Sequence, residues 1–232
     1  MMSKRYANAR YLAVALAMLA LIVLAACAKV SRISATARPT ASPRAAGVPE
    51  TATPPAPPTV ILASCLLPTV TAPTAQPGNP VFAQLDPATG LHVTGLPQTI
   101  DLASYRLEVS GKVDRPLLLR YDDLRCLRRV EARVKLVCQG YFEDTATWAG
   151  VPLSAVLGLA QVQPSATSLR LVGADGFANS VLLTVSDSDK NFLAYELEGQ
   201  PLPVWHGFPL RAVFPGLAGN TWVKWLIQIV VE

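Results

Sequence analysis

A cysteine at the end of an apolar run is the first residue in this sequence that could do chemistry. Cys138 follows Leu136-Val137 and precedes Gln139 and Gly140, so we expect it where a strand gives way to a loop. A rigid element holds the backbone at such a junction, and the loop leaves the side chain accessible. As a thiolate, Cys138 could ligate a soft metal or act as a nucleophile. The alternative is a small buried hydrophobic side chain, since free cysteine is among the most buried residue types.

A second candidate stretch, residues 199–225, carries His206, Arg211 and Lys224. Its prolines and glycines predict an irregular but rigid backbone. An arginine binds two oxygens of a phosphate or pyrophosphate at once, a lysine adds a point charge, and a histidine adds a hydrogen-bond donor. The stretch therefore suits phosphate binding. Alternatively, its Arg and His side chains bind backbone carbonyls of a proline-rich loop.

Histidine is scarce, which narrows the chemistry open to these residues. The chain has two histidines, His92 and His206. A metal site built from several histidines, or a triad with a histidine base, is therefore disfavoured. A cysteine hydrolase pairing Cys138 with His206 would also need an orienting residue, and only the presence of the two residues supports it.

Composition divides the 232-residue chain into two parts. Twelve of its 20 prolines precede residue 90, so we expect the globular part after them. The formal net charge is +4, but residues 97–232 carry 13 Lys and Arg against 14 Asp and Glu, which gives −1. No nucleic-acid partner is therefore expected. The cysteines, at positions 27, 65, 126 and 138, are too scattered for a CxxC metal site. Pairing of Cys126 with Cys138 would remove the candidate thiolate.

Residues 1–26 have the pattern of a lipoprotein signal peptide. Basic residues precede an apolar run that ends Leu24-Ala-Ala-Cys27. This ending is similar to the lipobox of bacterial lipoproteins, which implies lipidation of Cys27. The alternative is a plain transmembrane anchor, although the run is at the short limit for a span. Ser3-Lys4-Arg5-Tyr6 also resembles a weakened twin-arginine signal. We therefore expect export to the cell envelope and anchoring in the membrane through lipid on Cys27.

Residues 27–95 are rich in Pro, Thr and Ala and predict a tether. Such a composition cannot bury enough apolar area to offset its ordering entropy, and its prolines favour extended backbone. One apolar interruption, residues 60–67, could dock on the folded domain as a strand.

Residues 96–232 form the predicted folded domain. Alternating and apolar runs predict strands at 105–113, 117–119, 131–137, 169–172, 181–185 and 223–231. Apolar spacing predicts short helices at 121–127 and 153–160. The sum is a β-rich α+β fold, with mixed sheets and short helices around one core.

The motifs of this domain, taken together, resemble the molybdopterin-binding oxidoreductase domain of the sulfite oxidase family. In chain order they are Leu107-Glu-Val-Ser-Gly-Lys-Val-Asp-Arg-Pro116, Tyr121-Asp-Asp-Leu124, Val137-Cys-Gln-Gly140, Trp148-Ala-Gly-Val-Pro-Leu153, Ala174-Asp-Gly-Phe177, Leu193-Ala-Tyr195, Gly199-Gln-Pro-Leu-Pro203, His206-Gly-Phe-Pro-Leu-Arg211 and Val223-Lys-Trp225.

The resemblance implies a sulfite-oxidase-type fold that binds molybdopterin, the molybdenum cofactor. It implies that Cys138 supplies a thiolate to molybdenum, and that the cofactor pocket is made by His206, Arg211, Trp222, Val223 and Lys224. The implied reaction is oxygen-atom transfer on a small-molecule substrate, a sulfur or nitrogen oxide. The sequence has no haem, flavin or iron–sulfur motif, so we expect a separate electron-transfer protein as partner.

One alternative stays open beside this hypothesis. The sequence has no counterpart of an N-terminal segment that helps to hold the pterin in some relatives, and the arginine cluster that binds sulfite cannot be placed on it. A cofactor-free surface lipoprotein could use the same scaffold as a binding module.

Overall fold

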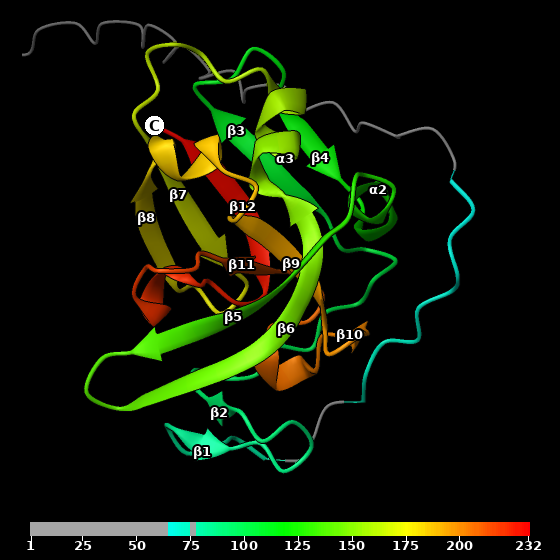
Figure 1. Cartoon of the computed structure of the whole chain (residues 1–232). Helices are drawn as coiled ribbons and strands as arrows, with labels where there is room; N and C mark the ends of the chain where they lie inside the picture. Colours follow the sequence, from blue (N-terminus) through cyan, green and yellow to red (C-terminus); the bar gives the residue numbers. More distant parts are fainter. Residues whose placement is uncertain (1–64, 75–77) are drawn as a thin grey trace, which may run out of the picture. The chain divides into compact units, whose positions relative to one another are not determined.

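Two five-stranded sheets and a small hairpin carry the site (Figure 1). The computed structural model describes residues 65–74 and 78–232. The expected signal peptide, Cys27 and most of the tether lie outside the described residues. None of the helices that the structure describes is long and apolar enough to cross a membrane.

The first sheet has the strand order β4-β3-β12-β7-β8. Its strands are β3 (Leu107–Gly111), β4 (Leu117–Leu119), β7 (Ser168–Gly173), β8 (Ala178–Leu182) and β12 (Leu226–Val231). β12 runs parallel to β3, and the other pairs are antiparallel. Leu107 and Val109 of β3 are fully buried, because residues two apart on a strand face the same side.

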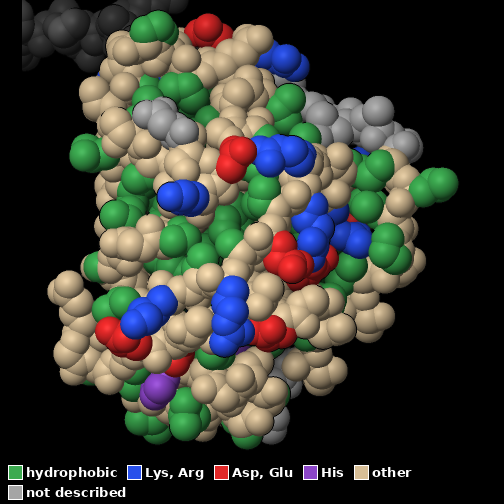
Figure 2. All heavy atoms as spheres, in the orientation of Figure 1, with side chains coloured by type: hydrophobic (Ala, Val, Ile, Leu, Met, Phe, Trp, Pro, Cys, Tyr) green, Lys and Arg blue, Asp and Glu red, His purple; other side chains and the backbone are tan. Residues whose placement is uncertain are grey.

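The second sheet has the order β10-β9-β6-β5, with β11 also paired to β9. Its strands are β5 (Val130–Cys138), β6 (Phe142–Pro152), β9 (Phe192–Leu197), β10 (Gln200–Pro201) and β11 (Arg211–Val213). The long β5–β6 hairpin runs diagonally across the front of the domain (Figure 1). Figure 2 shows Lys and Arg interleaved with Asp and Glu on this face. Next to β5, Arg129 forms ion pairs with Glu131 and Glu196.

A bulge lets β6 pair with both of its neighbours. The register between β6 and β9 shifts between Ala149 and Gly150. A Cβ atom at Gly150 would lie 1.9 Å from the carbonyl oxygen of Leu193, so the two backbones can approach only because residue 150 is glycine.

The helices are short. The predicted helices are confirmed as α2 (Tyr121–Arg125) and α3 (Leu153–Ala160), and α3 packs against β3, β6 and β9. Three 3-10 helices follow, η1 (Leu183–Asp187), η2 (Val204–His206) and η3 (Gly219–Thr221). The strand predicted at 181–185 is wrong in its second half, because the chain turns into η1 at Leu183.

Residues 78–95, here called the N-terminal strap, pack on the domain although we expected them in the tether. The strap contains the hairpin β1 (Gln84–Leu85) and β2 (His92–Val93). It buries Asp86, Leu91 and Val93. Ordered packing therefore begins before residue 96.

A disulfide fixes a more distant part of the tether. Cys65 is bonded to Cys126, with 5.8 Å between their Cα atoms. The pairing of Cys126 with Cys138 that the sequence allowed is therefore wrong, and Cys138 is a free thiol. Of residues 60–67, only 65–67 are described, and they form no strand.

One hydrophobic core joins the two sheets and α3. Its largest fully buried side chains include Phe192, Phe208 and Phe214. The predicted β-rich α+β fold with short helices is confirmed.

Candidate active site

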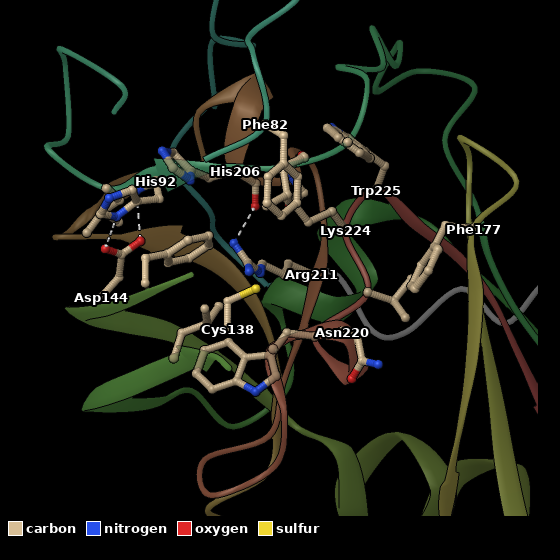
Figure 3. A pocket seen from close by; sticks show the side chains of 18 of the residues that line it. Phe82, His92, Cys138, Asp144, Phe177, His206, Arg211, Asn220, Lys224 and Trp225 are labelled. Atoms are coloured by element: carbon tan, nitrogen blue, oxygen red, sulfur yellow. Dashed lines mark hydrogen bonds and ion pairs between the residues drawn. The ribbon is translucent and has the colours of Figure 1, made fainter. Parts of the chain in front are cut away.

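A cavity of about 260 Å³ brings the residues singled out from the sequence together (Figure 3). Its lining includes all six predicted pocket residues, which are Cys138, His206, Arg211, Trp222, Val223 and Lys224. They come from the end of β5, from η2 and β11, and from the residues just before β12. The sequence predicted that these six residues line one pocket. That they bind a cofactor remains a prediction.

Cys138 is the last residue of β5, at the strand-to-loop junction that the sequence predicted. It pairs with Phe142 across a three-residue loop, in which Gly140 has a φ of +80°. That left-handed conformation favours glycine. The Cys138 carbonyl accepts a hydrogen bond from the Tyr141 amide at 3.0 Å. Burial raises the pKa of the thiol.

The segment after η2 folds back so that its cationic side chains meet. Ala212 donates its amide proton to the carbonyl of Val223 at 2.9 Å, and Leu226 donates to Leu210 at 2.9 Å. A parallel bridge from Ala218 to Val137 joins the same segment to β5. These contacts place residues 206–211, 218–225 and 136–138 around one space.

Arg211 lies inside the protein with little compensation for its charge. It is 7% exposed, and its guanidinium lies 4.8 Å from the ring centre of Trp148 and 5.8 Å from that of Trp222. It donates one hydrogen bond, to the His206 carbonyl at 3.3 Å. Its Nε atom is buried and has no hydrogen-bond partner among the described residues. Burial lowers the pKa of Arg211 to about 9, while Asp144 acts in the opposite direction.

Lys224 is the second cation of the cavity. Its Nζ donates to the carbonyls of Thr94 and Trp205 and lies 4.5 Å from the ring centre of Trp225. Desolvation, followed by repulsion from Arg211, lowers the pKa of Lys224 well below its ordinary value. Two basic side chains thus line one cavity.

His206 is buried and held through its Nε2 atom. Nε2 lies 3.0 Å from Asp86 Oδ2 and 2.9 Å from Thr89 Oγ1. Desolvation is the main cause that lowers the pKa of His206 to about 4, and the charges of Arg211 and Lys224 add to it. The ring is therefore neutral at pH 7.

A second histidine lines the cavity from the strap. His92 Nδ1 lies 2.7 Å from Asp144 Oδ1, and the His92 amide donates to Asp144 Oδ2 at 2.8 Å. The ring stacks on Phe142, with 4.5 Å between ring centres. The pair ties the strap to β6 at the edge of the cavity (Figure 3).

The sequence did not predict that residues of the N-terminal strap line the cavity. Leu91, His92, Thr94 and Gly95 line the cavity, and Asp86 holds His206 from behind. The only local signal was the Asp86-Pro-Ala-Thr-Gly90 turn, which predicts a reversal of the chain but not its partner.

Comparison with known proteins gives the class. The family model described as the oxidoreductase molybdopterin binding domain matches residues 93–232. The chain belongs to this family, and its relatives place it in the sulfite oxidase family.

Individual relatives agree with this assignment. The chain is 33% identical over 145 residues to the uncharacterized oxidoreductase YuiH of Bacillus subtilis, covering 61% of this chain and 73% of that one. It is 34% identical over 163 residues to mitochondrial sulfite oxidase of Homo sapiens, covering 57% of this chain and 30% of the human one. The crystal structure of the sulfane dehydrogenase SoxCD from Paracoccus pantotrophus matches with a TM-score of 0.56 and 27% identity, over 62% of this chain and 41% of that one.

The protein is therefore a molybdenum-dependent oxidoreductase whose cofactor is molybdopterin. The predicted sulfite-oxidase-type fold is confirmed by the likeness to SoxCD.

The donors of the cavity fit that cofactor. Molybdopterin carries a phosphate, a flat pterin and a dithiolene; the cavity offers two cations, an unpartnered Arg211 Nε–H, tryptophan walls and one free thiol. Within residues 65–74 and 78–232, no group of three or more His, Cys, Asp or Glu side chains could hold a metal ion. A metal bound beside Cys138 would also be ligated by the dithiolene sulfurs of the cofactor.

Proposed function

We propose that this chain is an exported, lipid-anchored molybdopterin enzyme that transfers an oxygen atom to or from a small sulfur or nitrogen oxide. The observation that carries the proposal is the free thiol of Cys138 in the same cavity as the buried Arg211 and the partly buried Lys224. When bound, the cofactor supplies a two-electron redox change coupled to oxygen-atom transfer.

Each pocket residue has its own role in binding the cofactor. Cys138 supplies a thiolate to the metal, which a soft metal centre favours. Arg211 and Lys224 bind the phosphate and compensate its charge, and in turn the phosphate relieves the cost of burying both cations. His206 contacts the pterin, and Trp222 and Val223 complete the pocket beside it.

The walls of the cavity serve to exclude water. Trp148 and Trp222 are 2% exposed and cover Arg211, so its interaction with an anion is little screened. Phe82 and Phe177 line the same cavity and remain half exposed, at 54% and 46%. The side between these two aromatic residues is the access route that we assign to the substrate.

The disulfide supports export. Disulfides persist in oxidising compartments and are rare in the cytosol, and Cys65–Cys126 joins the tether to the domain. We expect a Cys27→Ser change to move the protein from the membrane fraction to the soluble fraction. Unchanged membrane retention would rule out the lipid anchor.

The substrate class takes support from the relatives. Two of them are named for oxidation of sulfur compounds, a sulfite oxidase and a sulfane dehydrogenase. We propose a separate electron-transfer protein as partner, since residues 1–232 carry no haem, flavin or iron–sulfur motif.

The test compares the wild type with Cys138→Ser, both expressed with their own signal in a host that makes the cofactor. Molybdenum and pterin per chain are measured, together with turnover of sulfite, nitrate and methionine sulfoxide using redox dyes. We expect near-stoichiometric cofactor in the wild type and loss of turnover in Cys138→Ser.

The matched control is the double variant Cys65→Ser/Cys126→Ser, which removes two sulfur atoms away from the cavity. It should keep the cofactor and its turnover. A well-folded wild type without molybdenum or pterin would favour the binding-module alternative, and unchanged turnover in Cys138→Ser would refute the thiolate role.

A further inference from the structure

Asp86 lies outside the family match but reaches the cofactor cavity from behind. The family model begins at residue 93, whereas Asp86 lies in the strap and is 0% exposed. Its Oδ1 accepts the Ala88 amide at 2.9 Å. Its Oδ2 accepts the Thr89 hydroxyl at 3.0 Å and lies 3.0 Å from His206 Nε2.

This arrangement fixes which nitrogen of His206 carries the proton. The Ala88 amide and the Thr89 hydroxyl both donate to the Asp86 side chain, which favours its ionised form. A carboxylate can only accept hydrogen bonds, so Nε2 must be the donor. Because the Thr89 hydroxyl proton is directed to Asp86, it does not compete for Nε2. The neutral ring is therefore the Nε2–H tautomer.

The other ring nitrogen is then left as an acceptor. Among the described residues, His206 Nδ1 makes no hydrogen bond, and His206 lines the cavity. A pterin ring carries N–H donors on its amino and ring nitrogens. An acceptor on Nδ1 complements such a donor, whereas an Nδ1–H would oppose it.

We propose that Asp86 is a positioning residue of the cofactor site, which holds His206 as the Nε2–H tautomer so that Nδ1 accepts a hydrogen bond from the pterin. The inference rests on the proposed function, since it assumes that the pterin lies beside His206. It gives the strap a role that the family match does not contain.

The diagnostic variant is Asp86→Asn, which preserves shape and removes charge. The Ala88 amide still needs an acceptor, so the new amide oxygen faces Ala88 and its NH2 group faces His206. Two donors would then meet at Nε2 unless the ring changes tautomer. We expect the proton to move to Nδ1.

The first readout is the tautomer of His206 in the cofactor-free full chain, purified without a histidine tag. The chain has two histidines, so two-bond 1H–15N spectra at pH 7 resolve both rings, and a His92→Gln variant assigns them. We expect the Nε2–H pattern in the wild type and in Thr89→Val, and the Nδ1–H pattern in Asp86→Asn.

The second readout is the rate at which the loaded protein releases pterin into buffer, followed by fluorescence of the oxidised pterin. Loss of one acceptor and gain of an opposed donor should speed release roughly ten- to a hundredfold. The control is Asp101→Asn, because Asp101 caps a similar turn through the Ala103 amide at 3.2 Å without touching a histidine. It should leave both readouts unchanged.

The outcomes separate this inference from the proposed function. An Nδ1–H or doubly protonated His206 in the wild type at pH 7 would overturn it, even if Asp86→Asn fails to fold. So would a tautomer change in Asp86→Asn with wild-type pterin release. A wild type that never carries pterin would overturn the proposed function, while the spectra of the cofactor-free chain would still decide what Asp86 does to His206.

Discussion

Replacing Arg211 by methionine should stabilise the cofactor-free protein and weaken cofactor binding at the same time. Methionine fills a similar volume without charge and packs well against aromatic rings. In the cavity, Arg211 is 7% exposed and makes one hydrogen bond of 3.3 Å to the protein. The Arg211 side chain is therefore better placed to bind a ligand than to stabilise the fold.

The size of the effect follows from the burial of the charge. Lowering of the pKa of Arg211 to about 9 corresponds to a cost of about 5 kcal/mol for the charged form. Contacts with Trp148 and Trp222 return about 2 kcal/mol, and the bond to the His206 carbonyl about 1 kcal/mol. We therefore expect Arg211→Met to raise the free energy of unfolding of the cofactor-free protein by about 2 kcal/mol.

The same change removes the guanidinium from the phosphate. A charge-assisted hydrogen bond contributes about 1.5–3 kcal/mol, so cofactor affinity should fall about ten- to a hundredfold. Urea unfolding of the cofactor-free protein measures the first effect, and equilibrium binding of isolated cofactor measures the second.

The control is Arg170→Met on β7, where the arginine is exposed. It should change the free energy of unfolding by no more than about 0.5 kcal/mol. A cofactor-free Arg211→Met protein that is less stable than the wild type would refute the view that Arg211 is buried for a ligand.

Three further predictions concern stability. Reduction of the Cys65–Cys126 disulfide, or replacement of both cysteines by alanine, should lower the free energy of unfolding by about 2–4 kcal/mol. Urea unfolding with and without reductant measures this loss. An equal loss when reductant is added to the double-alanine variant would contradict the prediction. The His206 pKa of about 4 lies below the value in the unfolded chain. The neutral ring therefore contributes stability above about pH 6.5, and about 3 kcal/mol of it is lost as the pH falls toward 4. The free energy of unfolding, measured against pH, should fall less steeply in His206→Gln than in the wild type. Gly150→Ala should destabilise the protein by more than about 3 kcal/mol, because the Leu193 carbonyl occupies the space of the new Cβ. Gly158 is exposed on α3, and a Cβ there would have no atom within 4 Å, so Gly158→Ala should stabilise the protein by about 0.5–1 kcal/mol. Thermal unfolding of the two variants compares these effects.

Local patterns in the sequence were sufficient for the parts of the site that lie on well-marked elements. The strand before Cys138 and the helix at Leu153–Ala160 follow from apolar periodicity, and both are confirmed. The irregular stretch 199–225 grouped His206, Arg211 and Lys224 as candidate phosphate ligands, and the family motifs added Cys138 to the same pocket.

Tertiary contacts decided the rest. The strand β6 (Phe142–Pro152) was not predicted, because Glu143, Asp144 and Gly150 are residue types that strands disfavour, and its structure comes from pairing with both β5 and β9. The last strand begins at Leu226 rather than at residue 223, since Trp225 takes a φ of +49° where the chain bends around the cavity. The contact from Asp86 to His206 joins residues 120 positions apart, and no local sequence pattern at either residue predicts it.

We propose above all that Cys138 provides a sulfur ligand to the metal of a molybdopterin held in this cavity. X-ray absorption at the molybdenum edge counts sulfur neighbours of the metal in the loaded wild type and in Cys138→Ser. We expect one sulfur fewer in Cys138→Ser, with pterin still bound through Arg211 and Lys224. An equal sulfur count in the two proteins would contradict it.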